Sequence, residues 1–212
     1  MSDSTEDADC GCRGDTGRAA ADAAYRRALW IVVLLNVGFG LVEFVAGFLA
    51  GSQALKADSL DFLGDGSITF IGLLALAWTA STRAKVALTQ GIFLALLGLW
   101  VLGMAAWRAM NAVPPEAELM GGIGIVALAV NVTAALVLAR FREGGDAQAR
   151  AIWLFSRNDA INNVVVIIAA GLVYWLESAW PDLVVAAAIA VVFLHSAWEI
   201  IRDARRELRE SA

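Results

Sequence analysis

The sequence predicts an all-α membrane protein: a bundle of six transmembrane helices with both termini in the cytoplasm. Three observations support this fold class. Apolar residues make up 59% of the 212 residues and charged residues only 17%, whereas a soluble domain is about 45–50% apolar and about 25% charged. Six long apolar runs follow one another along the chain. Basic residues gather in the segments on one side of these runs.

Each apolar run has about the 20 residues that a helix needs to cross a bilayer. The predicted spans are about 28–51, 55–79, 86–107, 119–138, 151–175 and 183–201. Turn residues mark the breaks between them, at Gly51-Ser52, Ser81-Thr82, Pro114-Pro115, Gly144-Gly145 and Pro181. Because the connections are short, we expect neighbouring helices to be antiparallel.

The distribution of Lys and Arg predicts the orientation. Of the 16 basic residues, 13 lie before the first run, after the second, after the fourth or after the sixth. Cytoplasmic segments carry such an excess, so both termini are predicted to be cytoplasmic, in a multi-pass protein of the inner or plasma membrane.

The composition also predicts the domains and excludes several classes of partner. Residues 1–27 are rich in acidic and small residues, which predicts a disordered cytoplasmic tail. Residues 28–201 would form the transmembrane domain, and 202–212 a short cytoplasmic tail. A net charge of −5 argues against nucleic acid as a partner. Neither a Gly-rich phosphate loop nor a Ser/His/Asp constellation supports an enzyme.

Carboxylates inside the predicted spans are the main functional signal. An Asp at the centre of a span costs about 2.5–3.5 kcal/mol on insertion scales, so such residues are functional candidates. Asp58, Asp61 and Asp65 are spaced i, i+3, i+7, which places them on one face of the second span. Asp159 with Asn162 and Asn163 forms a similar face on the fifth span.

Oxygen ligands that converge from two helices suit a divalent cation. Carboxylate oxygens bind Zn²⁺ at about 2.0–2.2 Å, and four ligands complete a tetrahedral site. Metal binding requires deprotonated carboxylates, so the same groups could exchange a metal ion for protons. The expected metal ligands are Asp61, Asp65, Asp159, Asn162 and Asn163, with Asp58, Glu43 and Asn36 as possible secondary ligands.

Structural explanations stand beside these assignments. Each Asn could instead make an ordinary hydrogen bond between helices, and Asp58 could be a residue at the entry of its helix. Cys10 and Cys12 could capture a soft metal through thiolates, or be an inert reduced pair. His195, the single histidine, could shuttle protons or bond between helices, with Glu199 as its partner.

Two motifs resemble the cation diffusion facilitator family. Asp61-x-x-x-Asp65 on the second span looks like that family's metal-binding pair, and the stretch 155–163 around Asp159 is similar to a short cation transporter branch. The run from Asn36 to Asp61 resembles the family's first hairpin. The resemblance implies alternating access, with efflux of a divalent metal driven by inward movement of protons.

The chain departs from the family pattern in two places. Phe155 stands four residues before Asp159, where the family usually has His or Asp. The fourth ligand would then come from elsewhere, for instance an Asn, Glu43 or water, which makes the site harder and all-oxygen. Only residues 202–212 follow the sixth span, so we expect the C-terminal cytoplasmic domain of the family to be missing.

The leading hypothesis is a secondary transporter of divalent metal. Zinc is the first expectation for the transported ion, with cobalt or cadmium as alternatives. Protons, the lipid bilayer and a second copy in a homodimer are the other expected partners. Two alternatives remain open: a proton-coupled exporter of organic cations, and a membrane protein that senses metal through Cys10 and Cys12 without transporting it.

Overall fold

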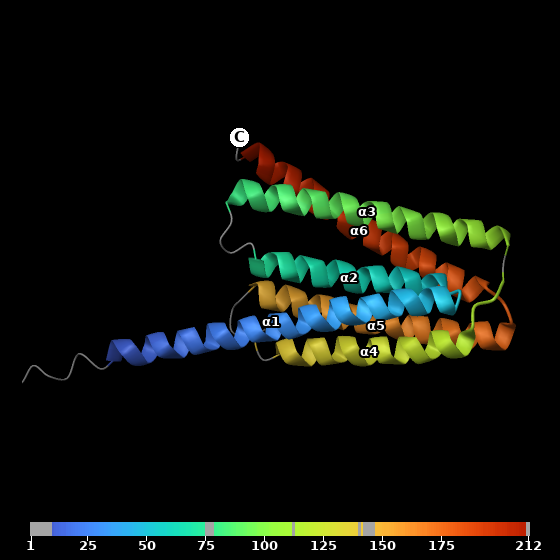
Figure 1. Ribbon diagram of the computed structural model, residues 1–212, viewed down its shortest axis with the longest axis horizontal. Helices are drawn as coiled ribbons and strands as arrows, with labels where there is room; N and C mark the ends of the chain where they lie inside the picture. Colours follow the sequence, from blue (N-terminus) through green and yellow to red (C-terminus); the bar gives the residue numbers. More distant parts are fainter. Residues whose placement is uncertain (1–9, 75–78, 112, 140, 142–146, 211–212) are drawn as a thin grey trace, which may run out of the picture.

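The computed structural model describes residues 10–74, 79–111, 113–139, 141 and 147–210, and within these ranges the side chains of all but 10–22, 80, 83 and 147–158. The described residues form six α-helices (Figure 1). The helices are α1 (Cys10–Leu49), α2 (Gln53–Leu74), α3 (Ala80–Met110), α4 (Ala117–Ala139), α5 (Ala147–Leu176) and α6 (Trp180–Glu210). The predicted all-helical bundle is thereby confirmed.

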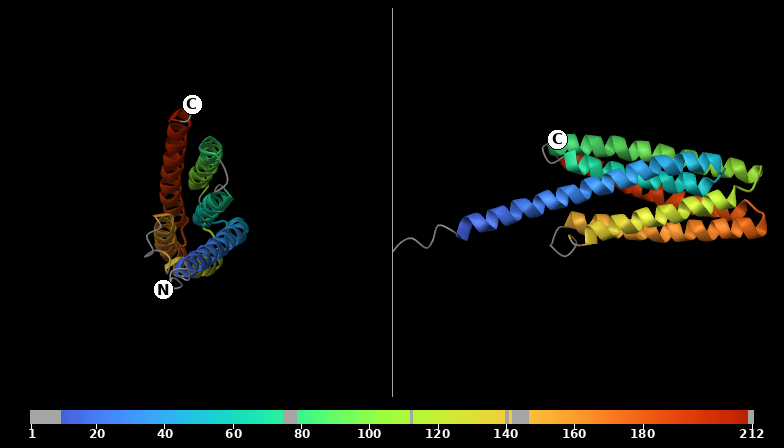
Figure 2. Two further views of the ribbon diagram at one scale, coloured as in Figure 1. Left: turned by 90° about the vertical axis from the view of Figure 1, so that its left-hand side faces the viewer. Right: turned by 60° about the horizontal axis from the view of Figure 1, so that its bottom comes forward.

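The helices run side by side and pack chiefly as three pairs. α1 packs along α2, α4 along α5, and α3 along α6, and Figure 2 shows the pairs from two further directions. The α1–α2 contact is very close, since a Cβ added to Gly66 would lie 2.6 Å from Cγ2 of Val37. The first described residues of α1 and the end of α6 lie at the same end of the bundle (Figure 1).

Five of these helices are long and apolar enough to cross a membrane: α1, α3, α4, α5 and α6. The sixth, α2, carries Lys56 and three aspartates, which lower its mean hydropathy. Large apolar side chains are exposed around the bundle, among them Leu34, Leu49, Leu136 and Ile168. Such a surface is stable against lipid rather than water, so the fold is that of a multi-pass membrane protein.

Three helix boundaries differ from the predicted ones. α1 begins at Cys10, well inside the segment expected to be a disordered tail, where several alanines favour helix. α3 begins at Ala80, because Thr79 caps it by accepting a hydrogen bond from the backbone N–H of Thr82. The predicted break at Pro181 lies in the first turn of α6, a position that tolerates proline.

A tight turn joins α1 to α2 and is held from a distant part of the chain. Gly51 has φ of +68°, a backbone conformation that favours glycine. Asp182 of α6 accepts hydrogen bonds from Ser52 Oγ (2.5 Å), Gln53 N (2.8 Å) and Ala54 N (3.0 Å). We call this contact the far-end clasp, since it lies at the end of the bundle opposite the described start of α1.

Candidate functional site

A cavity of about 350 Å³ lies between α2, α5 and α6, with contributions from α1 and α3. Five of the residues singled out from the sequence line it: Asn36, Asp61, Asp65, Asp159 and Asn162. From the middle of the bundle the cavity extends along α2 and α6 toward the end that carries the start of α1. Asp61 and Asp65 from the polar face of the second span thus share one cavity with Asp159 and Asn162 from the fifth, whereas Asp58 and Asn163 do not line it.

The three aspartates approach one another within this cavity. The carboxyl group of Asp159 lies within hydrogen-bonding reach of those of Asp61 and Asp65. Carboxylates so close repel one another strongly where water is scarce, unless protons or a cation neutralise them. In the described part of the chain, however, no three His, Cys, Asp or Glu side chains are gathered around one point in a ready-made metal cluster.

A second carboxyl pair lies beside the cavity, on the side of the far-end clasp. Glu43 of α1 and Asp58 of α2 are both fully buried, and their carboxyl groups lie within hydrogen-bonding reach of each other. Among the described residues, no donor forms a hydrogen bond with the side-chain oxygen atoms of Glu43 or Asp58. Two ionised carboxylates cannot bond to each other, because neither carries a hydrogen to donate. Asp58 is not a cap of α2, because the far-end clasp and Ser52 occupy that role.

The asparagines divide between the cavity and the packed interior. Asn163 is fully buried outside the cavity, and neither of its side-chain polar atoms is hydrogen-bonded within the described residues. Asn131 of α4 is also buried, away from the cavity. The side chains of Cys10, Cys12 and Phe155 lie outside the described residues.

Glu199 is the site residue that sequence reasoning missed. It comes from α6 and lines the same cavity as Asp65 and Asp159. Its position near the end of the sixth span and its spacing from His195 suggested only a pairing on one helix. Acidic side chains supply all the charge among the described residues that line the cavity, so the cavity is suited to cations.

The far end of the bundle is closed by buried polar contacts. Asp182, Ser52 and Gln53 are each buried, and the far-end clasp joins α6 to the start of α2. Lys56 is also buried, with Nζ 4.3 Å from the centre of the Phe48 ring. The described structure is thus closed at the far end, with its carboxylate-lined cavity in the other half.

These features define a class of protein: a multi-pass helical membrane protein with a carboxylate-lined cavity within the bundle. The particular family follows from comparison with known proteins. The family model described as "Cation efflux transmembrane domain" matches residues 29–209, and the chain belongs to this family. The resemblance noted at Asp61 and Asp65 is therefore confirmed.

Several characterised proteins are similar to this chain. The zinc transporter ZitB of Escherichia coli K12 is 29% identical over 191 residues, covering 84% of this chain and 61% of that protein. The cadmium, cobalt and zinc/H(+)-K(+) antiporter of Bacillus subtilis 168 is 27% identical over 207 residues, covering 89% and 65%. The mouse proton-coupled zinc antiporter SLC30A2 is 25% identical over 206 residues, covering 84% and 55%. The chain spans about three fifths of the length of the first of these relatives.

Proposed function

We propose that this protein is a secondary transporter that exports divalent transition-metal cations in exchange for protons. The observation that carries the proposal is the meeting of Asp61 and Asp65 from α2 with Asp159 from α5 in one cavity inside the bundle. Membership of the cation efflux family and the names of the relatives support it.

The charge of the cavity supplies a mechanism for the exchange. Three neighbouring carboxylates are costly inside a membrane, and either protons or one divalent cation lowers that cost. A metal ion binds only the deprotonated carboxylates and releases their protons. Because the same oxygen atoms serve both cargoes, loading one expels the other, which couples the two fluxes. Helix movements that expose the cavity to each side in turn would complete the cycle.

Zinc is the proposed first cargo, with cobalt and cadmium as further substrates. Asp61, Asp65 and Asp159 would be the protein ligands, and Asn162 lies in the same cavity to supply an amide oxygen. Asn163 remains a less direct candidate because it is buried outside the cavity. We propose cytoplasmic termini from the distribution of basic residues, and a homodimer as the assembly.

The alternative functions have weaker support. A site for organic cations is expected to be lined with aromatic rings, but Phe193 is the one aromatic residue among the described residues that line the cavity. A pure sensor that works through Cys10 and Cys12 would leave the buried carboxylates without a role.

Purified protein in proteoliposomes tests the proposal. With an acidic lumen and zinc, cobalt or cadmium outside, we expect metal to enter the vesicles while protons leave, with both fluxes vanishing in protein-free vesicles. The Cys10→Ser/Cys12→Ser variant should transport like the unmodified protein. Transport of a quaternary ammonium compound without metal transport would contradict the proposal.

A further inference from the structure

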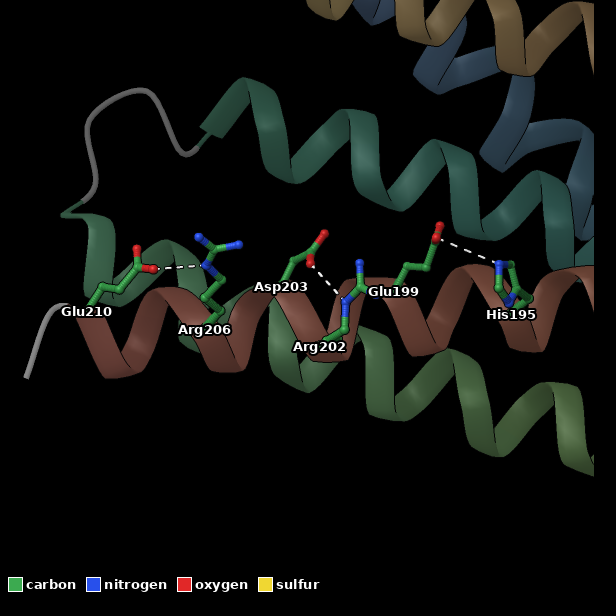
Figure 3. Close-up of polar contacts among 6 residues, drawn as sticks. All are labelled: His195, Glu199, Arg202, Asp203, Arg206 and Glu210. Atoms are coloured by element: carbon green, nitrogen blue, oxygen red, sulfur yellow. Dashed lines mark hydrogen bonds and ion pairs between the residues drawn. The ribbon is translucent and has the colours of Figure 1, made fainter.

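The single histidine of the chain lies beside Glu199, the partner that its spacing predicts. Nε2 of His195 is 3.7 Å from Oε1 of Glu199, one turn later on α6, and Figure 3 shows the two side chains on the same side of the helix. The His195 side chain is 72% exposed and that of Glu199 53%. Glu199 lines the cavity that holds Asp65, so the pair lies at the edge of the candidate site.

The spacing of the two atoms fits a shared metal ion better than a hydrogen bond. A distance of 3.7 Å is too long for a hydrogen bond, because a side-chain contact is no longer one at about 3.6 Å. Two ligand atoms that are each about 2.1 Å from a tetrahedral ion lie about 3.4 Å apart. An imidazole nitrogen and a carboxylate oxygen are both ordinary zinc ligands, so a small rotation of either side chain would complete the geometry.

The neighbouring charges on α6 are arranged differently. Arg202 Nε donates to Asp203 at 3.4 Å, and Arg206 Nε donates to Glu210 at 2.9 Å (Figure 3). These two carboxylates therefore have a guanidinium beside them. Among the ion pairs of the described residues, Glu199 contacts the imidazole of His195 and no guanidinium. The carboxylate oxygen atoms of Glu199 are therefore available to a cation.

We propose that His195 and Glu199 form a capture site for a divalent transition-metal cation at the edge of the cavity. Water would complete the coordination, and the ion would pass from there to Asp65 and Asp159. Two protein ligands hold an ion more weakly than a full set of four. Weak binding suits a site that must release the ion to the carboxylates inside the cavity. This inference rests on the proposed function, because it deepens the route to the same cavity.

The single histidine makes a direct spectroscopic test possible. The protein is produced with 15N-labelled histidine and without a polyhistidine tag, and the imidazole resonances are followed in detergent while zinc or cadmium is added. We expect a saturable shift of the His195 signals in the unmodified protein. The shift should persist in Asp65→Asn, which weakens the central site, and Glu199→Gln should weaken the apparent affinity about tenfold. Glu210→Gln, on the same helix, is the matched control and should leave it unchanged.

Transport kinetics supply the second readout. His195→Gln and Glu199→Gln are each expected to raise KM for metal uptake about tenfold, with a much smaller effect on the maximal rate. Imidazole signals that do not move with metal, while the unmodified protein transports it, would overturn the capture site and leave the proposed function standing. Absence of metal flux in the unmodified protein would overturn the proposed function, and the imidazole shift would still decide whether His195 binds metal.

Discussion

Replacing Asp65 with alanine is expected to abolish metal-dependent proton flux in proteoliposomes. Asp65 shares the cavity with Asp61 and Asp159, and its carboxyl group lies within reach of that of Asp159. Its removal takes away a charged ligand and an exchangeable proton together. Removing a residue that only orients a metal ligand costs about 10–100-fold in metal affinity or activity. Removing a ligand itself should therefore reduce the flux by at least about 100-fold.

A pH-sensitive dye inside the vesicles measures this flux after zinc is added outside. Asp203→Asn is the matched control, because Asp203 is an exposed aspartate that pairs with Arg202 on α6. We expect it to behave like the unmodified protein. Normal flux in Asp65→Ala would show that the carboxylates of the cavity are not the transport site.

The largest effect on stability is expected from Asp182→Ala. Asp182 is 1% exposed and accepts three hydrogen bonds that join α6 to the start of α2. Alanine would leave the backbone N–H groups of Gln53 and Ala54 buried without an acceptor. Each unsatisfied group costs about 1–3 kcal/mol, so the variant should be destabilised by about 2–6 kcal/mol.

Thermal unfolding in detergent measures the difference. Ser52→Ala keeps the Asp182 carboxylate and removes the hydroxyl that also caps Leu55, so it should cost less, about 1 kcal/mol. The expected order of melting temperatures is unmodified protein, Ser52→Ala, then Asp182→Ala. Equal melting of Asp182→Ala and the unmodified protein would contradict the role of the far-end clasp.

In the proposed transport cycle the far-end clasp would also matter, because α2 carries both Asp61 and Asp65. Asp182 of α6 binds the start of α2, and α2 carries Asp61 and Asp65 into the cavity that Asp159 of α5 also lines. Movement of α6 against α2 would change the cavity at one end and the clasp at the other.

The sequence could predict the features that depend on local pattern. Apolar runs located the helices, and the spacing of Asp61 and Asp65 predicted one shared helix face, from which both line the cavity beside Asp159. Those arguments work because a helix fixes which residues share a face, and because buried charge is costly in lipid. The start of α1 was less predictable, since weak helix propensities compete with high polarity in that segment.

The features that depend on distant partners were not predictable. By position Asp182 only lies between the fifth and sixth predicted spans, but its hydrogen bonds reach residues about 130 positions earlier in the chain. The spacing of Glu199 predicts only its pairing with His195 on the same helix, although Glu199 also lines the cavity. The contacts of Asp182 and Glu199 both depend on how α6 packs against α2. The spacing of residues along one helix cannot predict that packing.

The most direct test of the central claim is equilibrium binding of metal to the purified protein. Isothermal titration of zinc into the unmodified protein should give saturable binding accompanied by proton release. Asp61→Ala, from α2, and Asp159→Ala, from α5, should each weaken that binding at least about 100-fold, because the ion needs carboxylates from both helices. Unchanged zinc affinity in either variant would contradict a shared metal site between α2 and α5.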